Sequence, residues 1–354
     1  MAVYHIGMDL HRRFSQLTEM DKEGRVYRKF KLYNHPDLLK DYFSNLPCSS
    51  SVVIEATGNW YWVCDLIEEL GHTVKLAHPK KVKIIAESTV KTDKIDSEVL
   101  AHLGRTSFLP LSYIPPKHIR EERELLRYRM CLVRIRSGLK NRIHNILSKV
   151  GVIHTFSDLF GRGGVNFLRE IDLPGIYKDE LQGYLQVIET LDNLIKSCEK
   201  EIRRSVKENK DATLLMSVPG FSYFSALLMA AEIGDISRFS SYRKLCAYGG
   251  VVSSTKQSAD KIYQGHIIKD SNKYIRWVLT EAVCKAIAKN QRLKVTCFKI
   301  LRKKGKSKAK IAVARKMLIS IYYMLKNKSQ YKFFHLNARE RRKTNMSGRI
   351  YSFR

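Results

Sequence analysis

Residues 51–79, "SVVIEATGNWYWVCDLIEELGHTVKLAHP", predict a strand, a helix and a second strand in succession. The run 51–56 is short and apolar, as in the buried central strand of a sheet. Residues 61–71 have a helical pattern that closes on Gly71, and residues 73–79 return to a strand pattern. A strand–helix–strand unit of this kind indicates an α/β domain.

The residues before this unit add three more strands. The stretch "VYHIGMDL" (3–10) is rich in β-branched and aromatic residues. The stretches "FSQLTEMD" (14–21) and "RVYRKFKLYN" (25–34) predict a hairpin around a turn at residues 22–24. Together these strands predict a mixed sheet that is covered by helices.

The chain is strongly basic, with 64 Lys and Arg against 34 Asp and Glu and a formal net charge of +30 over 354 residues. Such an excess attracts polyanions, and nucleic acid is the usual one because phosphate contacts release condensed counterions. A membrane surface is the rival partner, but no apolar run approaches the ~20 residues that span a bilayer. The length predicts two or three domains, and 44% hydrophobic residues suffice for their cores.

The seven cysteines are scattered and contain no C-x-x-C pair, which argues against a zinc ribbon or a disulfide framework. They favour a reducing compartment. The N-terminal stretch also lacks the long apolar segment of a signal peptide. We therefore expect a cytoplasmic protein that binds nucleic acid and no membrane.

After Pro115-Pro116, which marks a boundary, the chain is predicted to be mainly helical. One helical pattern contains Leu125, Tyr128, Leu132, Ile135 and Leu139. After a Gly-rich break, a heptad pattern contains Leu181, Tyr184, Ile188, Leu191, Ile195, Cys198 and Ile202. The heptads predict a coiled-coil seam, formed either within one chain or between subunits.

The last part of the chain is predicted to be compact and helical, with a polar, Ser-rich loop at 253–265 and helices near 273–289 and 307–326. From residue 291 to the end, twenty Lys and Arg stand against a single acid, Glu340. The tail after residue 337 has the composition of an unstructured segment.

Four carboxylates stand at positions that suit a metal site. Asp9 and Glu55 each end a predicted strand, and Asp93 and Asp96 share one helix face in "VKTDKIDSEVLAHL" (90–103). Taken singly, such acids are more often turn caps or part of a solvated face. Brought together, they would repel one another without a cation, and oxygen ligands favour Mg²⁺ or Mn²⁺ over zinc.

The stretches "IGMDLHRR", "VVIEATGNWYW" and "VKTDKIDSEVLAHL" together resemble the DEDD transposases of bacterial insertion sequences, relatives of the Piv-type DNA invertases. The resemblance covers nearly the whole chain in the expected order. It implies a RuvC-like (ribonuclease-H-like) α/β domain in which Asp9, Glu55, Asp93 and Asp96 hold Mg²⁺, or Mn²⁺ in its place. It also implies a protein associated with the nucleoid.

A second family signature lies in "YGGVVSSTKQSADKIYQGHIIKDSNKYIRWVL" (248–279). The family's pattern Gly–x–Ile–x–Lys–x–x–Asn matches residues 265–272 without gaps, which places the family's serine nucleophile on Ser258. The family usually has Gly after this serine, whereas this chain has Ala259.

The resemblance implies that the serine attacks DNA and forms a covalent protein–DNA intermediate, with the two domains meeting across the subunits of a dimer or tetramer. It also implies a guide RNA, encoded by the element, that pairs with donor and target DNA. Ser253 and Ser254 lie in the same loop and stay open as alternative nucleophiles. We expect nucleic-acid contacts from Lys269, Lys273, Arg276, Lys303 and Lys304, although a charge run is usually a solvated face.

Four segments are expected: a RuvC-like domain (1–112), a helical coiled-coil oligomerisation segment (113–210), a mainly α transposase domain with helix-hairpin-helix character (211–336) and a basic tail (337–354). We interpret the chain as a transposase that cuts and rejoins DNA strands. The main rival is a metal-dependent RuvC-like nuclease or junction resolvase that uses water as the nucleophile. A second rival is an architectural DNA-binding protein whose acids are structural.

Overall fold

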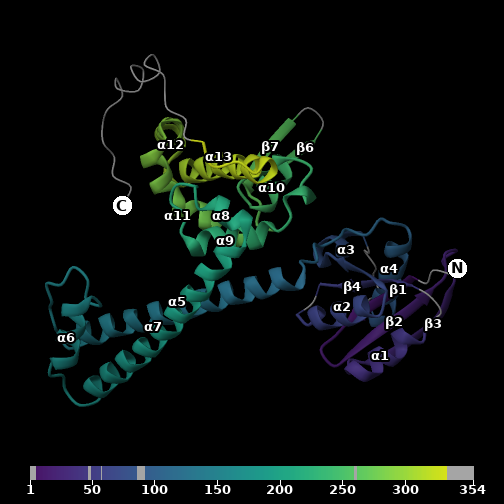
Figure 1. The fold of residues 1–354 in the computed structure, drawn as a ribbon, viewed down its shortest axis with the longest axis horizontal. Coiled ribbons are helices and arrows are strands. Elements are labelled where there is room, and N and C mark those ends of the chain that lie inside the picture. The colour runs from purple at the N-terminus through teal and green to yellow at the C-terminus, as the bar shows by residue number, and fades with distance from the viewer. Residues whose placement is uncertain (1–4, 47–48, 57, 86–91, 259–260, 333–354) are drawn as a thin grey trace. The chain divides into compact units, whose positions relative to one another are not determined.

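The computed structural model describes residues 5–46, 49–56, 58–85, 92–258 and 261–332 (Figure 1). The chain forms two compact units, Met1–Pro115 and Pro116–Arg354, which we call the N-terminal unit and the C-terminal unit. The boundary falls on the pair of prolines, where two successive backbone nitrogens have no proton to donate. The predicted basic tail at 337–354 lies outside the described residues.

The N-terminal unit is built on a five-stranded sheet with the strand order β3-β2-β1-β4-β5. Its strands are β1 (His5–Leu10), β2 (Phe14–Met20), β3 (Val26–Tyr33), β4 (Ser51–Glu55) and β5 (Thr73–Ala77). β2 pairs antiparallel with β1 and β3, whereas β4 pairs in parallel with β1 and β5. The predicted mixed α/β architecture is therefore confirmed, and it is consistent with a RuvC-like fold.

Helices cover both faces of this sheet. On one face, α1 (Pro36–Ser44) and α2 (Trp60–Glu69) pack against the apolar side chains of β1 and β4. On the other face, α4 (Asp93–Arg105) lies across β1, β2 and β4. A further helix, α3 (Pro79–Ile85), follows β5. Because side chains alternate along a strand, Ile6 and Met8 point towards α1 and α2, whereas Gly7 and Asp9 point towards α4.

Gly7 allows α4 to lie directly on β1. A Cβ atom at this position would lie 1.9 Å from the backbone oxygen of Ser97 and 2.5 Å from the backbone nitrogen of Ala101. The hydroxyl groups of Ser97 and Thr18 share a hydrogen bond of 2.8 Å, which ties the helix to β2 as well. The close approach fixes the first turn of α4 beside the end of β1.

Two long helices dominate the first half of the C-terminal unit. α5 (Lys117–Lys149) and α7 (Ile176–Glu208) pack along each other, and α6 (Arg162–Glu170) lies between them in the sequence (Figure 1). Six of the seven heptad residues of α7 are buried, and Tyr184 is partly buried. Since Leu181 and Leu191 pack against Ile143 and Leu132 of α5, the seam is satisfied within one chain.

The predicted pattern of α5 needs a correction. Leu132 is buried, but Tyr128 and Ile135 are 49% and 45% exposed. Instead Leu126 and Ile143 are fully buried on the inner side of this helix. The reason is that α5 packs against α7 along most of its length but against α9 near its start, so one stripe of residues cannot face both neighbours.

The second half of the C-terminal unit is a compact helical body. It contains α8 (Lys210–Leu215), α9 (Tyr223–Ile233), η1 (Ile236–Arg238), α10 (Tyr242–Tyr248), α11 (Lys273–Lys289), α12 (Gln291–Lys304) and α13 (Lys306–Asn327). Eight apolar residues of α9 are buried in the core of this body, around most of the helix rather than along one stripe. Pro219-Gly220 lies in the turn between α8 and α9, as predicted, and Gly220 there has a φ of +90°.

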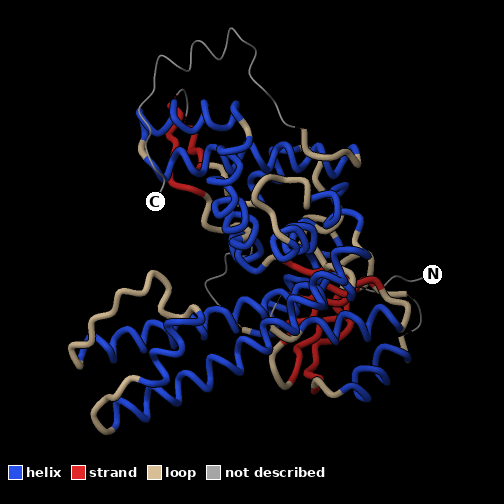
Figure 2. The backbone as a smooth tube through the Cα atoms, turned by 60° about the vertical axis from the view of Figure 1, so that its left-hand side comes forward, coloured by secondary structure: helices blue, strands red, loops and turns tan. Residues whose placement is uncertain are grey.

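The predicted polar loop at 253–265 is wrong. These residues form a two-stranded antiparallel hairpin of β6 (Ser253–Ser258) and β7 (Lys261–Ile267) (Figure 2). The polar composition concealed the strands, because most of their described side chains are exposed and give no alternating apolar pattern. Within the described ranges, no helix is long and apolar enough to cross a membrane.

Candidate active site

The fold brings the four predicted carboxylates to one edge of the sheet. Asp9 lies near the end of β1, and Glu55 is the last residue of the adjacent parallel strand β4. Asp93 and Asp96 lie in the first turn of α4, which packs over the ends of both strands. The carboxyl ends of parallel strands are where α/β sheets bind ligands.

The start of α4 is defined by local chemistry. Thr92 is the N-cap residue, and its side-chain oxygen accepts a hydrogen bond of 3.4 Å from the backbone nitrogen of Ile95. The helix N-terminus favours the negative charges of Asp93 and Asp96 even without a ligand. These two acids therefore stabilise the start of α4 whether or not a metal is bound. A metal site is indicated only by the groups that lie around them.

Asp9 is the buried member of the cluster, with 6% of its surface exposed. Burial raises the pKa of its carboxyl group from 3.8 to about 6. The nearby His11 lowers this pKa, whereas the charges of Asp93, Asp96 and Glu55 raise it further. All three other predicted carboxylates thus act electrostatically on Asp9, as expected for groups that surround one site.

His11 completes the cluster, and sequence reasoning missed it. Its Nε2 atom lies 3.2 Å from a carboxylate oxygen of Asp9 and 3.2 Å from one of Asp93. One ligand atom from each of these three residues lies within 4.8 Å of the others, which is the spacing of a metal-binding group. A ring nitrogen therefore stands among the oxygen atoms that were expected as ligands.

Two asparagines hold the turn that carries His11. Asn34 and Asn59 each donate a side-chain hydrogen bond to the backbone oxygen of His11, at 2.7 and 2.9 Å. The ring nitrogen Nε2 is buried, and although it lies 3.2 Å from both carboxylates, it forms no hydrogen bond with any residue that the structure describes. A buried nitrogen without a hydrogen bond, aimed between two carboxylates, suits a bound divalent cation. The residues present thus fit the metal that the family resemblance implies.

The predicted nucleophile lies in the C-terminal unit. Ser258 is the last residue of β6, and its backbone is opposite Lys261 of β7, next to the hairpin turn. Ser253 is the first residue of the same strand. The hydroxyl of Ser254 donates a hydrogen bond of 3.2 Å to the backbone oxygen of His266. This hydroxyl is therefore already engaged within the hairpin.

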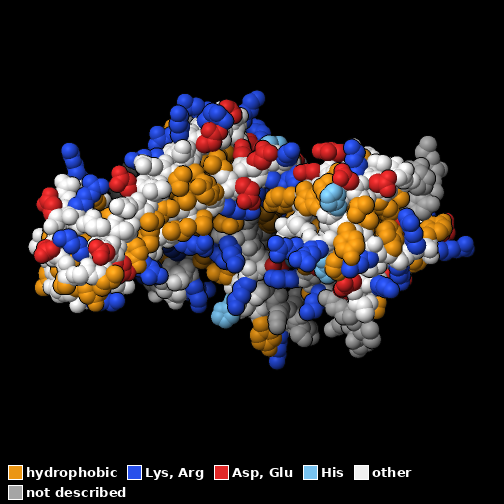
Figure 3. Space-filling model, turned by 90° about the horizontal axis from the view of Figure 1, so that it is seen from below, with side chains coloured by type: hydrophobic (Ala, Val, Ile, Leu, Met, Phe, Trp, Pro, Cys, Tyr) orange, Lys and Arg blue, Asp and Glu red, His pale blue; other side chains and the backbone are white. Residues whose placement is uncertain are grey.

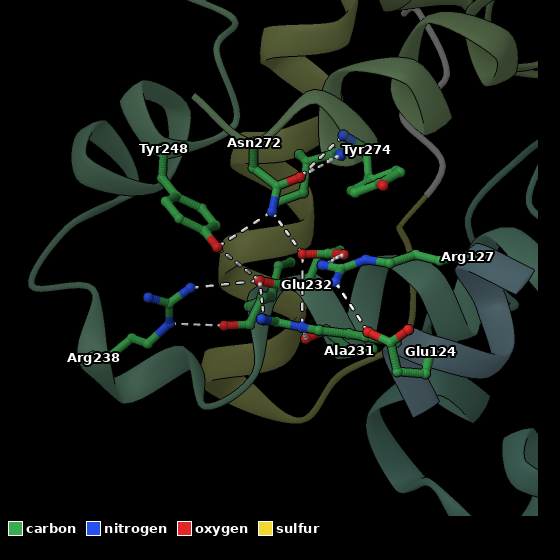
Figure 4. A network of polar contacts seen from close by, with 11 residues as sticks. Glu124, Arg127, Ala231, Glu232, Arg238, Tyr248, Asn272 and Tyr274 are labelled. Atoms are coloured by element: carbon green, nitrogen blue, oxygen red, sulfur yellow. Dashed lines mark hydrogen bonds and ion pairs between the residues drawn. The ribbon is translucent and has the colours of Figure 1, made fainter. Parts of the chain in front are cut away.

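A buried network of polar groups holds the segment that follows this hairpin (Figure 4). Asn272 is the N-cap of α11, and its Oδ1 atom accepts hydrogen bonds from the backbone nitrogens of Tyr274 and Ile275 at 3.0 and 3.2 Å. Its Nδ2 atom donates to Oε2 of Glu232 at 2.8 Å and to the hydroxyl of Tyr248 at 3.2 Å.

Glu232 is the centre of this network, and its side chain is only 2% exposed. Two arginines of α5 neutralise it: Arg123 Nε lies 3.6 Å from Oε2, and Arg127 Nη2 lies 3.3 Å from Oε1 (Figure 4). The backbone oxygen of Glu232 accepts further hydrogen bonds from Arg123 and Arg238. The network therefore joins α5, the end of α9 and the start of α11.

The predicted nucleic-acid contacts lie at two places in the C-terminal unit. Lys269 and Lys273 are exposed around the start of α11, and the half-buried Arg276 donates a hydrogen bond of 3.5 Å to the backbone oxygen of Gly250. Lys303 and Lys304 end α12. Together with Lys299 and Lys316 they line a groove whose other residues are Val295, Thr296 and Ile300. On the face drawn in Figure 3, Lys and Arg side chains clearly outnumber acidic ones.

Comparisons with known proteins match both units. A model of DEDD transposases of the IS110 type matches residues 6–151, and a model described as "Transposase IS116/IS110/IS902 family" matches residues 212–296. A "Probable family 20 transposase" of Pseudomonas aeruginosa is 29% identical over 290 residues, which are 79% of this chain and 82% of the relative. The "Transposase for insertion sequence element IS1111A" of Coxiella burnetii is 26% identical over 350 residues, 92% and 91% of the two chains. A transposase for IS1328 of Yersinia enterocolitica is 25% identical over 278 residues, 78% and 81% of the two chains.

Proposed function

We propose that this chain, which matches models of IS110- and IS116-type transposases in both of its units, cuts and rejoins DNA strands to move an insertion sequence. The observation that carries the proposal is the meeting of Asp9, Glu55, Asp93 and Asp96 at one sheet edge. A carboxylate cluster of this kind is the usual holder of the divalent cations that assist phosphodiester chemistry.

In the proposed reaction, Asp9, His11 and Asp93 would hold the divalent cation, and the charges of Glu55 and Asp96 would act on the same site. The cation, when bound, would withdraw charge from the scissile phosphate and stabilise the charge that develops in the transition state. Asp9 must release its proton for this, and its pKa of about 6 permits that near neutral pH. Mg²⁺ is the cation we propose, with Mn²⁺ as its substitute, because both favour carboxylate oxygens and Mn²⁺ accepts an imidazole nitrogen more readily than Mg²⁺ does.

Ser258 is the proposed nucleophile. Its hydroxyl oxygen forms a bond to the phosphorus while the bond to one DNA oxygen breaks, and the serine proton ends on the departing DNA hydroxyl. The phosphodiester energy is kept in the serine–DNA bond, so attack by another DNA hydroxyl can rejoin the strands and regenerate Ser258. The gapless match of residues 265–272 to the family pattern supports Ser258 over Ser253, and the internal hydrogen bond of Ser254 argues against that residue.

We also propose an RNA partner and an oligomeric active form. The net charge of +30 suits a protein that holds two DNA molecules and a guide RNA encoded by the element. The metal cluster and Ser258 lie in different units of the chain, which suits a dimer or tetramer in which units of different subunits meet. The exposed lysines Lys269, Lys273, Lys303 and Lys304, and Arg276, are the proposed phosphate contacts.

The proposal is tested with labelled DNA that carries the native locus and its flanks, with and without RNA transcribed from that locus. Wild type is expected to bind and cut this DNA in the presence of Mg²⁺ or Mn²⁺. Asp9→Ala should bind but not cut. If Asp9→Ala supports transposition as well as wild type does, the acids are structural and the protein is architectural.

The second candidate function is a hydrolytic RuvC-like nuclease or junction resolvase, which the carboxylate cluster alone also supports. The hydrolytic nuclease and the proposed transposase differ in the behaviour expected of one variant. A hydrolytic enzyme attacks with water, so Ser258→Ala would still cut DNA, whereas in the proposed transposase this variant cuts none.

A further inference from the structure

The sheet face that carries Asp9 continues across two more strands. The register places Asp9 opposite Gln16 of β2 and Gln16 opposite Lys31 of β3. Two residues along the same strands, Phe14 lies opposite Tyr33. Residues directly opposite one another share a face, and alternate residues of a strand do too. Asp9, Gln16, Phe14, Lys31 and Tyr33 therefore share one face of the sheet.

Only part of this face is covered by α4. Thr18 lies under the helix, where its hydroxyl bonds to Ser97, and Lys29 is paired with Glu98 at 2.6 Å. Towards the other end of β3, Lys31 is exposed and Tyr33 is 60% exposed. The face thus emerges from beneath α4 close to the metal cluster.

Side-chain contacts link this exposed part to the cluster. The rings of His11 and Phe14 have centroids 4.8 Å apart. The ammonium group of Lys31 lies 3.9 Å from the centre of the Phe14 ring and 5.3 Å from that of Tyr33. We call Phe14, Lys31 and Tyr33 the flanking row, because they continue outward from His11.

The flanking row and its neighbour Gln16 contain polar groups that have no ionic or hydrogen-bonding partner among the described residues. Lys31 forms no ion pair with any acid in the described parts of the chain, unlike Lys29 on the same strand. Gln16, between Asp9 and Lys31, is 5% exposed, and its Nε2 atom has no hydrogen-bond partner within the described residues. An ammonium group that has no acidic partner, beside an exposed aromatic ring, is the combination that binds a nucleic-acid strand, by a phosphate contact and by base stacking.

We propose that the flanking row binds the DNA strand that is being cut, next to the scissile phosphate. Lys31 contacts a backbone phosphate, and a base stacks on the exposed ring of Tyr33. The main-chain positions of Asp9 and Lys31 are two strand spacings apart, about 10 Å, which places this contact within a few nucleotides of the metal cluster. The position beside the cluster favours the cut DNA strand over a guide RNA. The inference rests on the proposed function.

The chain offers a closely matched control. Tyr27 lies on the same strand as Tyr33 and has the same exposure, 60%. The two tyrosines are six residues apart, which is about 20 Å along a strand. A general effect of removing an exposed β3 tyrosine on folding or on the basic surface would appear in both Tyr27→Ala and Tyr33→Ala.

The experiment measures the affinity of full-length wild type, Tyr33→Ala, Lys31→Ala and Tyr27→Ala for a fluorescent single-stranded 20-mer DNA from the native locus. Fluorescence anisotropy is recorded over a series of salt concentrations, because high salt suppresses the sequence-independent contribution of the basic surface. Tyr33→Ala should weaken binding roughly 5- to 150-fold, the loss of one stacked base. Lys31→Ala should lower the slope of log affinity against log salt by about one. Tyr27→Ala should bind like wild type.

Photo-crosslinking gives a second, position-specific measurement. An oligonucleotide with 5-iododeoxyuridine at successive positions around the cut should crosslink to Tyr33 near the cut only, and mass spectrometry identifies the attached residue. Equal affinities of Tyr33→Ala and Tyr27→Ala together with no crosslink to Tyr33 would overturn the inference. The same titrations are repeated with an RNA 20-mer of the same sequence, and a loss of affinity for the RNA alone would also overturn the inference, in favour of a guide-RNA contact. If the wild-type protein binds DNA through the flanking row but never cuts it, the proposed function is wrong while the inference that the flanking row binds DNA holds.

Discussion

Asn272 donates a hydrogen bond of 2.8 Å from its side-chain nitrogen to the buried carboxylate of Glu232, which lies forty residues earlier in the chain. The same side chain caps α11 through its oxygen atom, so one amide joins the end of α9 to the start of α11. Asn272 also closes the stretch that matches the family's second signature. The network therefore fixes where the chain leaves the β6–β7 hairpin that carries Ser258.

Asn272→Asp should destabilise the protein more than Asn272→Ala. Alanine loses the cap and one hydrogen bond, at a cost of about 1–3 kcal/mol. Aspartate keeps the cap but sets a second carboxylate against the buried Glu232. Asn290→Asp is the matched control, because Asn290 also caps a helix, α12, but its Nδ2 faces the hydroxyl of Tyr331. Urea denaturation measures the free energies of unfolding. Equal losses for Asn272→Asp and Asn290→Asp would contradict the role assigned to Glu232.

Gly7→Ala should displace α4 from the sheet. The new methyl group would lie 1.9 Å from the backbone oxygen of Ser97, so helix or strand must move, at a cost of about 3 kcal/mol or more. Cation binding should weaken as well, because Asp93 and Asp96 move with the helix. Gly58→Ala is the control, since nothing lies within 4 Å of a Cβ atom there. Denaturation and cation titration check both effects, and a Gly7→Ala protein as stable as Gly58→Ala refutes the packing described above.

Asp9 predicts a pH dependence of stability in the metal-free protein. Its pKa is about 6 in the folded protein against 3.8 in the unfolded chain, so native Asp9 keeps a proton that the unfolded chain has already released. The free energy of unfolding should therefore fall as the pH rises from about 4 to about 6, by at most about 3 kcal/mol. Asp9→Asn removes this penalty and should be the more stable protein above pH 6. Denaturation curves at several pH values test this, and an unchanged pH profile in Asp9→Asn speaks against the buried carboxylate.

His11→Ala should weaken Mn²⁺ binding more than Mg²⁺ binding. Mg²⁺ prefers oxygen ligands, whereas Mn²⁺ gains more from an imidazole nitrogen, so removal of Nε2 should change the ratio of the two affinities. Calorimetric titration of the full-length protein with each cation measures this without any DNA. His35→Ala is the control, because His35 is exposed in the same unit and is paired with Asp37. Identical Mn²⁺ and Mg²⁺ losses in His11→Ala would exclude a ligand role for His11.

The sequence revealed the sheet and the acids because their signals are local. Residues 51–56 are apolar enough to read as a buried strand, and the helix that starts at Asp93 has its own capping residue. The hairpin at 253–267 gave no such signal, since its strands are stabilised by cross-strand hydrogen bonds that any polar sequence can form.

The parts that were missed depend on contacts between distant segments. His11 joins the cluster only because α4 returns over the end of β1, eighty residues later in the chain. Likewise the buried carboxylate of Glu232 is stabilised by Arg123 and Asn272, which come from two other helices. No residue spacing within one segment predicts such contacts. The one local signal for His11 is that it is a polar residue two positions after Asp9 at the end of a strand.

The central claim is that Ser258 attacks DNA with the help of the carboxylate cluster. The most direct measurement is to purify tagged protein under denaturing conditions from cells that carry its native locus, and to sequence any DNA that stays attached. We predict attached DNA ends in wild type and none in Ser258→Ala or Asp9→Ala. DNA that remains attached to Ser258→Ala would contradict the assignment of the nucleophile. Wild-type protein that cuts its DNA and carries none would contradict the covalent mechanism itself.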